Sequence, residues 1–326
     1  MGGFAPTLPI GTLNLALSNF AREFRNNNYV GDRIAPRVPV DRQSFQYIIF
    51  DQSNLRLDRN VVRAPGTSPQ EDRMTYSAAP YMCVSHALKA RIPYESEKRS
   101  NEAGFSLRRS ATQRLIDKLN LSREAYIAAL ALTGPNTTPL SGASMWDPTA
   151  GGHPLIAVEG AKAAIAQTGV QANLLILSDP VFRALKNHPD ILGRFLYKDG
   201  TSAAVTLGML SEAFGVECVL GSAIAEDKGG NRSYVWGLNA VLAYSQPVSS
   251  EADLSAMKTF DWSEAPDTVG GYGVLEYPDP DLAAKADIVA ADWYWDTRIT
   301  GPETLYTFTN CVQAPTMIAP TAITQF

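Results

Sequence analysis

The sequence has few of the residues that stabilise small cross-linked or metal-bound folds. Its three cysteines lie far apart, which excludes a disulfide framework and a cysteine zinc site: Cys83, Cys218 and Cys311. The longest purely apolar run has eight residues, Ala125–Leu132, far below the roughly 20 that a membrane-spanning helix needs. The first twenty residues contain no lysine or arginine, so we expect neither a secretory signal peptide nor a membrane partner.

The overall composition is that of a folded globular protein. Hydrophobic residues make up 45% and charged residues 19% of the chain, which excludes an intrinsically disordered protein. Glycine (24) and proline (21) are too few for a low-complexity or collagen-like chain. A length of 326 residues exceeds the usual size of a single core, so we expect two or three packed subdomains.

Residues with catalytic or metal-binding chemistry are scattered. His86, His153 and His188 lie in different segments without the close spacing of a zinc site. We expect His86 to be half-buried on the apolar face of a strand and His188 to favour the final carbonyls of a helix. Asp292 and Asp296 share one predicted strand, where we favour a solvated charge ladder over an acid–base pair. Without a phosphate-binding or nucleophile motif, the sequence predicts a protein that is not an enzyme and needs no cofactor.

Positive charge is concentrated in the first part of the chain. Residues 1–123 hold 18 lysines and arginines against 11 acidic residues, or +7, and residues 124–326 hold 10 against 22, or −12. We favour a basic extension that packs on an acidic body of the same kind of chain. A nucleic-acid reading site is the weaker alternative, because no cluster interleaves basic and aromatic residues.

The N-terminal residues have the pattern of an arm rather than of a domain. Apolar residues recur at helical spacing and predict a short helix over 12–25: Leu13, Leu17, Phe20 and Phe24. A helix this short is marginal in water, so its apolar stripe needs a surface to lie on.

A long pair of strands joined by a loop follows the arm. We expect one strand at 45–50 and a return strand at 82–92 with period-two alternation. Between them, residues 51–73 carry many charges of both signs and turn at Pro65-Gly66. Such a segment is not stable as a free hairpin. It therefore either docks on a neighbouring molecule or is a mobile surface loop, and the sequence leaves both open.

Three further regions follow along the chain. Residues 102–133 have apolar residues at three- and four-residue steps, which predicts a helix of about 45 Å that ends at Gly134-Pro135. From His153 onward, helices and strands alternate in a compact body of about 100 residues. We expect helices at 156–168 and 204–214 and from 179 to Pro189, strands at 174–177, 216–220 and 234–245, and a polar loop at 225–232. The last region is strand and turn, and its sheet is expected to pack on the long helix, with strands at 259–262, 272–277, 288–299 and 305–312.

Two stretches of sequence carry a family resemblance. ANLLILSDPVFRALKNHPDILGRF (Ala172–Phe195) and TLGMLSEAFGVECVLGSAIAED (Thr206–Asp227) are similar to the axial domain of tailed-bacteriophage major capsid proteins with the Hong Kong 97-type shell fold. The order of the parts, namely arm, long loop, long helix, αβ body and β-rich return, resembles the same family across most of the chain.

The resemblance implies an α+β fold of the Hong Kong 97 type. Residues 1–40 would be the N-terminal arm and 41–92 the extended loop. Residues 93–149 and 251–326 would form the peripheral domain around a spine helix at about 102–133, and residues 150–250 the axial domain.

The resemblance also implies a function and a location. The chain would self-assemble through hexamers and pentamers into an icosahedral shell around the double-stranded DNA of a phage. It would be made in the host cytoplasm and end in the virion capsid. An encapsulin-like cargo shell shares the fold and is the alternative, and a soluble hydrolase or binding protein with an unrecognised site is a third hypothesis.

The arm and the loop provide the candidate contacts between copies: Leu13, Leu17, Phe20, Phe24, Arg56, Asp58, Arg59, Arg63, Glu71, Asp72 and Arg73. In the founding family member, loop lysines join asparagines of neighbouring subunits. Lys89 is the only lysine between residues 40 and 92 here, so we expect no such crosslink. No long helical segment precedes the arm, so the expected partners are a separate scaffolding protein, a portal and possible decoration proteins. Packaged DNA would be bound without sequence specificity through local arginines.

Overall fold

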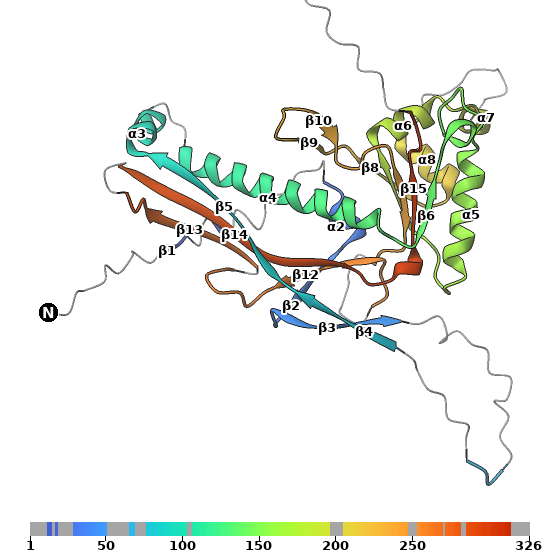
Figure 1. The fold of residues 1–326 in the computed structure, drawn as a ribbon, viewed down its shortest axis with the longest axis horizontal. Coiled ribbons are helices and arrows are strands. Elements are labelled where there is room, and N and C mark those ends of the chain that lie inside the picture. The colour runs from blue at the N-terminus through green and yellow to red at the C-terminus, as the bar shows by residue number, and fades with distance from the viewer. Residues whose placement is uncertain are drawn as a thin grey trace, which may run out of the picture. The chain divides into compact units, whose positions relative to one another are not determined.

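The computed structural model describes residues 12–14, 17–18, 29–50, 65–68, 76–102, 106–195, 205–246, 253–269, 271–281 and 285–313 (Figure 1). The chain divides into two compact units that are each built from two separated stretches of sequence. Unit 1 comprises Met1–Leu130 and Ser245–Pro302, and unit 2 comprises Ala131–Tyr244 and Glu303–Phe326.

Unit 1 is built on a six-stranded mixed sheet around its longest strand, β14 (Ala286–Ile299). β14 pairs with β5 along one edge and with β13 and then β12 along the other. β1 adds to β13, and β2 pairs in parallel with β12. The bounds of these strands are β1 Thr12–Leu13, β2 Arg37–Val40, β5 Val84–Pro93, β12 Met257–Trp262 and β13 Tyr272–Pro278.

Helix α4 (Leu107–Ala131) lies along one face of this sheet, as Figure 1 shows. Its inward residues Leu115, Ile116 and Leu119 are buried in one core with Trp293 and Trp295 of β14. The long helix expected from the sequence is confirmed and is continuous through the middle. It begins at residue 107 because a separate helix, α3 (Tyr94–Glu102), comes before it.

The predicted return strand is two strands that belong to different sheets. β3 (Ser44–Phe50) pairs with β4 (Tyr76–Met82) in a separate hairpin, whereas β5 joins the six-stranded sheet. The break falls at Cys83, whose backbone N–H donates to Gln43 O at 2.8 Å. The expected strand over 82–92 is therefore confirmed for residues 84–92, whereas Met82 belongs to β4 and β5 pairs with β14 instead of with the strand at 45–50.

Near the N-terminus, the predicted helix over 12–25 does not begin where it was expected. Thr12 and Leu13 form a strand that pairs with Glu276 and Leu275. A helical turn follows, in which Ser18 N donates to Asn14 O at 2.9 Å. Helix α2 (Gly31–Ile34) comes before β2.

Unit 2 contains a five-stranded sheet in the order β6-β15-β11-β7-β8. All five residues of β7 are buried, which agrees with the predicted apolar strand. The sheet also includes β15, so the expectation that residues 305–312 pack with the sheet of the long helix is wrong. Its strands are β6 Asn136–Pro139, β7 Leu174–Ser178, β8 Glu217–Gly221, β11 Ala240–Ala243 and β15 Leu305–Thr309.

Helices pack on this sheet around one large core. They are α5 Pro154–Ala166, α6 Asp179–Lys186, α7 Pro189–Arg194 and α8 Leu207–Phe214. Two short 3-10 turns are η2 Gly142–Ser144 and η4 Pro302–Thr304, and η4 begins at the boundary between the two units. α8 ends at Gly215, whose φ of 66° is the left-handed conformation that glycine adopts easily. The predicted helices of this region are confirmed, with shifts of a few residues at their ends.

Two expectations for residues 225–245 are wrong. The predicted polar loop is a small hairpin, β9 (Ile224–Glu226) and β10 (Arg232–Tyr234), whose tip is held by hydrogen bonds from Gly229 N and Asn231 N to Asp227 Oδ1. The predicted strand over 234–245 is interrupted by a turn at Gly237, and only β11 is part of the sheet.

Candidate assembly surfaces

The β3–β4 hairpin is anchored to unit 1 by a cluster of aromatic rings. The ring of Tyr81 stacks on Phe260 of β12 at a centroid distance of 4.3 Å, and the Tyr47 ring lies 5.4 Å from the same phenyl group. The Tyr47 hydroxyl donates to Ile299 O at 3.4 Å. Cys83 lies in the same core, with its Sγ 3.5 Å from Phe260 O. The base of the hairpin is therefore a fixed part of the unit.

A buried carboxylate reinforces this anchor. Asp296 of β14 is 6% exposed and accepts hydrogen bonds from Met82 N at 2.9 Å and from Arg298 Nε at 2.8 Å. Asp292 lies four residues away, about 13 Å along the strand, and burial together with the charge of Asp267 raises its pKa. The favoured expectation of a solvated charge ladder is therefore wrong, and the two carboxylates do not form an acid–base pair.

The outer face of the hairpin is exposed and, apart from Ser44 and Gln46, apolar. We define it by Ile48, Ala78, Pro80 and Met82, which point away from the side chains of the aromatic anchor. Ile48 is 38% and Met82 55% exposed. Beside it, Val84 of β5 is also exposed. A fixed base with an apolar outer face is the geometry of a contact surface, because exposed apolar groups gain free energy when a partner covers them.

The described residues near the N-terminus lie on the sheet and helix of unit 1. Asn14 N donates to Val274 O at 2.9 Å, and Val274 N donates to Ser18 Oγ at 3.0 Å. Leu17 packs against the core that α4 shares with the sheet. Further on, the Tyr29 hydroxyl donates to Asp117 Oδ1 at 3.0 Å. These contacts attach both described ends of the arm to the same chain.

Helix α2 is held by a carboxylate of α4. Glu124 accepts hydrogen bonds from Val30 N at 3.0 Å and from Gly31 N at 2.7 Å. A Cβ on Gly31 would lie 2.6 Å from Glu124 Oε2, so a larger residue at this position would displace the carboxylate. These two hydrogen bonds satisfy backbone N–H groups at the start of the helix, where a negative charge is favourable.

An ionic network continues from α2 into the sheet. Asp32 pairs with Arg123 of α4 and with Arg37 of β2, whose Nε lies 3.1 Å from Asp32 Oδ1. The guanidinium groups of Arg37 and Arg123 lie 4.6 and 4.9 Å from the centroid of the Trp293 ring. Burial opposes ionisation of Asp32, but the two arginines outweigh it and lower its pKa to about 2.

Asp261 of β12 has the opposite electrostatic balance. Its side chain accepts a hydrogen bond from Trp293 Nε1 at 3.2 Å and is almost completely buried. Burial raises its pKa to about 6, in spite of the attraction of Arg37 and Arg123. The same cluster therefore contains one carboxyl group that ionises easily and one that resists ionisation.

The histidines and cysteines have structural surroundings. His86 is half-buried and stacks on Trp295 at 4.1 Å, as expected, and burial lowers its pKa. His188 differs from the expectation: it precedes α7, and its Nδ1 accepts from Asp190 N at 3.2 Å. Burial raises the pKa of the three free thiols. Within the described residues, no group of three or more His, Cys, Asp or Glu could hold a metal ion.

The structure describes only part of the predicted contact set. Leu13 lies in β1, and Leu17 packs on the chain's own core. The other predicted contact residues lie outside the described residues: Phe20, Phe24, Arg56, Asp58, Arg59, Arg63, Glu71, Asp72 and Arg73. Sequence reasoning missed the hairpin's outer face and the ionic network. The outer face had a detectable signal, the apolar residues Ile48, Ala78, Pro80 and Met82 at alternate positions of the two strands. The network, in contrast, joins residues from separate elements, so no local pattern marks it.

The long helix on a mixed sheet, the anchored hairpin and the second αβ unit together form a Hong Kong 97-type capsid fold. No family model matches the chain. The chain is similar to the major capsid protein of Burkholderia phage BcepMu, with 27% identity over 235 residues, 70% of this chain and 75% of that protein. The major capsid protein of Pseudomonas phage JBD67 is 24% identical over 239 residues, again 70% and 75% of the two chains.

Solved structures share the fold over nearly the whole chain. A phage-related protein from Bordetella bronchiseptica RB50 superposes with a TM-score of 0.73 and 26% identity, over 93% of this chain and 98% of that one. The capsid of cyanophage P-SCSP1u has a TM-score of 0.55 and 10% identity, over 94% of this chain and 92% of that one. The SrpI encapsulin from Synechococcus elongatus has a TM-score of 0.53 and 9% identity, over 92% of this chain and 95% of that one. Both share the fold alone. The comparisons confirm the resemblance found in the sequence, to the shell-forming major capsid proteins of tailed phages. Of the helices in the described part of the chain, none is long and apolar enough to cross a membrane.

We expect Asp261, which is buried, and Asp32, which is held by two arginines, to give opposite pH dependences of stability. The pKa of Asp261 rises from an ordinary 3.8 to about 6 on folding, so the free energy of unfolding falls, by at most about 3 kcal/mol, as the pH rises from about 4 to 6. The pKa of Asp32 drops to about 2, so its contribution is lost as the pH falls from about 4 to 2. Asp261→Asn should remove the first change, and Asp32→Asn the second.

Denaturant unfolding of the unassembled chain between pH 2 and 7 measures both effects. Each variant serves as the control for the other, because the two groups titrate in different windows. An Asp261→Asn chain that still loses stability between pH 4 and 6 as the unsubstituted chain does would contradict the assignment.

Proposed function

We propose that the chain is the major capsid protein of a tailed bacteriophage and self-assembles into an icosahedral shell that encloses double-stranded DNA. The main support is the β3–β4 hairpin, whose base is fixed by Phe260 and Asp296 while its outer face remains apolar and exposed. A hairpin of this kind gains stability when a neighbouring copy covers it. The names of the two curated relatives support the same function.

Within this proposal, the parts of the chain keep the roles implied by the family resemblance. Residues 1–40 serve as the arm, 41–92 as the extended loop, and the α4 region with the six-stranded sheet as the peripheral domain. The axial domain, expected at 150–250, gains β6 and β15, because both strands belong to its sheet. The partners are further copies in hexamers and pentamers, a separate scaffolding protein, a portal, possible decoration proteins and the packaged DNA.

Electron microscopy of the expressed chain, with analysis of the contents of the particles, tests this function. We expect closed icosahedral particles in a phage-infected or prophage-induced host, containing nuclease-protected double-stranded DNA. Particles that contain a protein cargo and no nucleic acid would identify an encapsulin-like shell instead, which shares the fold. A chain that remains monomeric at high concentration would refute both.

The hairpin's outer face should be needed for assembly and not for folding. Ile48→Glu with Met82→Glu should leave the free energy of unfolding of the unassembled chain within about 1 kcal/mol, because both side chains are exposed. The same double variant should form no closed particles. Tyr81→Ala is the contrasting variant, since it removes a buried ring and should cost about 3–5 kcal/mol of stability. Normal particles from the double variant would refute the contact role.

The charged loop should also act between copies. Deleting residues 54–70 removes Arg56, Asp58, Arg59 and Arg63 and should leave both units folded, as judged by circular dichroism. Assembly followed by light scattering should then fail to reach closed shells. Particles of normal size from this deletion would contradict the role of the loop.

The mature shell should not be covalently crosslinked through the loop. Lys89, the only lysine between residues 40 and 92, lies in the middle of β5, at the base of the extended loop and outside its charged part at 51–73. Denaturing gels of purified particles should therefore give a single monomer band. A ladder of covalent oligomers would show that this expectation is wrong.

A further inference from the structure

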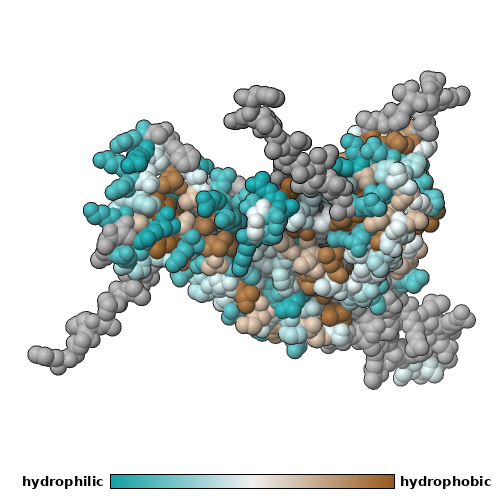
Figure 2. All heavy atoms as spheres, turned by 45° about the horizontal axis from the view of Figure 1, so that its top comes forward, coloured by the Kyte–Doolittle hydropathy of each residue, from teal (hydrophilic) through white to brown (hydrophobic). Residues whose placement is uncertain are grey.

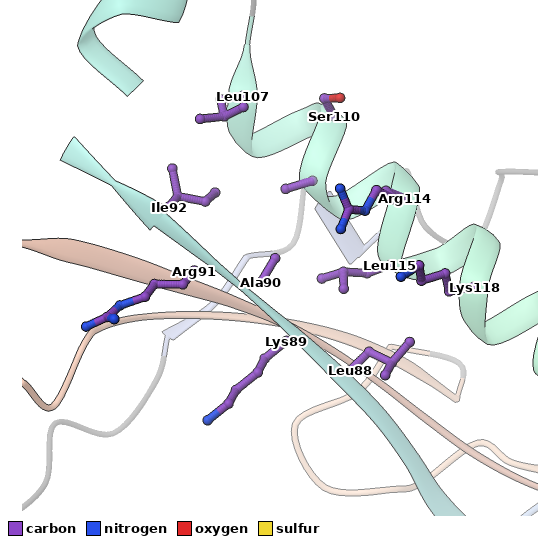
Figure 3. Close-up of a pocket in the computed structure, with 11 residues that line it drawn as sticks. Leu88, Lys89, Ala90, Arg91, Ile92, Leu107, Ser110, Arg114, Leu115 and Lys118 are labelled. Carbon is purple, nitrogen blue, oxygen red and sulfur yellow. The ribbon is translucent and has the colours of Figure 1, made fainter. Parts of the chain in front are cut away.

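A groove of about 460 Å³ runs between strand β5 and helix α4 of unit 1. Figure 3 shows Leu88, Ala90 and Ile92 on the side of β5 that faces the helix, whereas Lys89 and Arg91 point away from it. Leu107, Ala111 and Leu115 line the helix side, so the floor of the groove is apolar. In the space-filling view, hydrophobic residues lie between the hydrophilic ones at the α3 end of unit 1 (Figure 2).

The groove opens beside a strand edge. β5 has ten residues and, among the described strands, pairs only with β14. Its other edge therefore has no strand partner within the described part of the chain. Such an edge presents a row of backbone donors and acceptors to which an extended peptide can add. An added strand would continue the sheet and place alternate side chains in the groove.

The groove is lined by cations, and none of its lining residues is acidic. Lys89 on β5 and Arg114 and Lys118 on α4 form no ion pair with any described residue. Nearby cations are neutralised: Arg108 is bound to Glu97 and Asp287, and Arg91 pairs with Asp279. The unpaired cations therefore leave the rim of the groove with a positive potential.

We propose that this groove binds an extended acidic segment of a second protein, in which apolar residues alternate with carboxylates. On a strand added to β5, the apolar side chains meet Leu88, Ala90 and Ile92 beneath α4. The intervening carboxylates lie on the opposite face, beside Lys89. Arg114 and Lys118 add longer-range attraction for the acidic segment.

Charge and polarity distinguish this occupant from two others. The phosphate backbone of a nucleic acid gains nothing from an apolar floor. The loop of a second copy is a poor match, because residues 51–73 carry four arginines against four acidic residues and so have no net negative charge. The inference concerns a different surface from the hairpin's outer face and does not require that shells form.

A direct binding measurement tests the proposal. The probe is a fluorescein-labelled peptide of about nine residues in which valine and glutamate alternate, long enough to span β5. We expect its fluorescence anisotropy to rise with the full-length, unassembled chain, and the affinity to fall as salt increases. A peptide of the same composition with its valines and glutamates in separate blocks should bind at least about tenfold more weakly.

Variants locate the binding to the groove. Lys89→Glu with Arg114→Glu and Lys118→Glu should weaken binding by at least about tenfold, since three favourable charges become repulsive. Lys228→Glu, at the tip of the β9–β10 hairpin, is the matched charge reversal and should have no effect. Ala111→Trp fills the groove without changing charge and should also abolish binding. This variant keeps the test decisive if the triple variant fails to fold.

Three results would overturn the proposal. The first is equal binding of the alternating and block peptides, and the second is peptide affinity unchanged in both groove variants. The third is competition by another occupant: a short DNA duplex that displaces the peptide, or self-association of the chain that disappears with Ala111→Trp.

Discussion

Strand β14 holds the parts of unit 1 that could contact another molecule. It pairs directly with β5, and its Asp296 holds the β3–β4 hairpin. Its backbone pairs with β5 on one side and with β13 and β12 on the other. Its side chains alternate in role: Trp293 and Trp295 form the core under α4, whereas Asp296 holds the hairpin at Met82 N. A strand with this many partners cannot shift register without breaking the core and the hairpin anchor together.

The consequence for assembly is a division between rigid and exposed parts. The hairpin base is fixed by stacked rings and a buried carboxylate, while its outer face and the edge of β5 remain available to other molecules. Anchored surfaces of this kind lose little conformational entropy when they bind, because their backbone is already ordered. The arm is also anchored, because Glu124 and the ion pairs of Asp32 hold its C-terminal end, at helix α2, against α4.

Much of the secondary structure could be predicted from the sequence, because the signals are local. The periodicity of residues 107–131, the apolar run of β7 and the glycine stop after α8 each depend on a few adjacent residues. The division of the return strand at Cys83 could not be predicted. Side-chain alternation continues through this residue, while the partner strand changes from β3 to β14. Residues 305–309 likewise belong to the sheet of unit 2 because they pair with β6 and β11, and no local sequence pattern predicts this pairing.

The candidate surfaces were less predictable than the fold. The comparisons agree with the resemblance to capsid proteins, but the charged residues chosen from residues 51–73 lie outside the described residues. The electrostatic network requires Asp32, Arg37, Arg123, Glu124 and Asp261 to meet across four elements. Each of these residues looks ordinary in its own segment, and only the tertiary contacts give it a distinct pKa or partner.

The late position of β14, well after α4 in the sequence, has a consequence for biosynthesis. Residues 286–299 leave the ribosome after residues 1–130, so the sheet of unit 1 lacks its central strand until then. Unit 2 is completed later still, because β15 follows at residues 305–309. A nascent chain therefore lacks Asp296, the carboxylate of the hairpin anchor, until β14 has emerged.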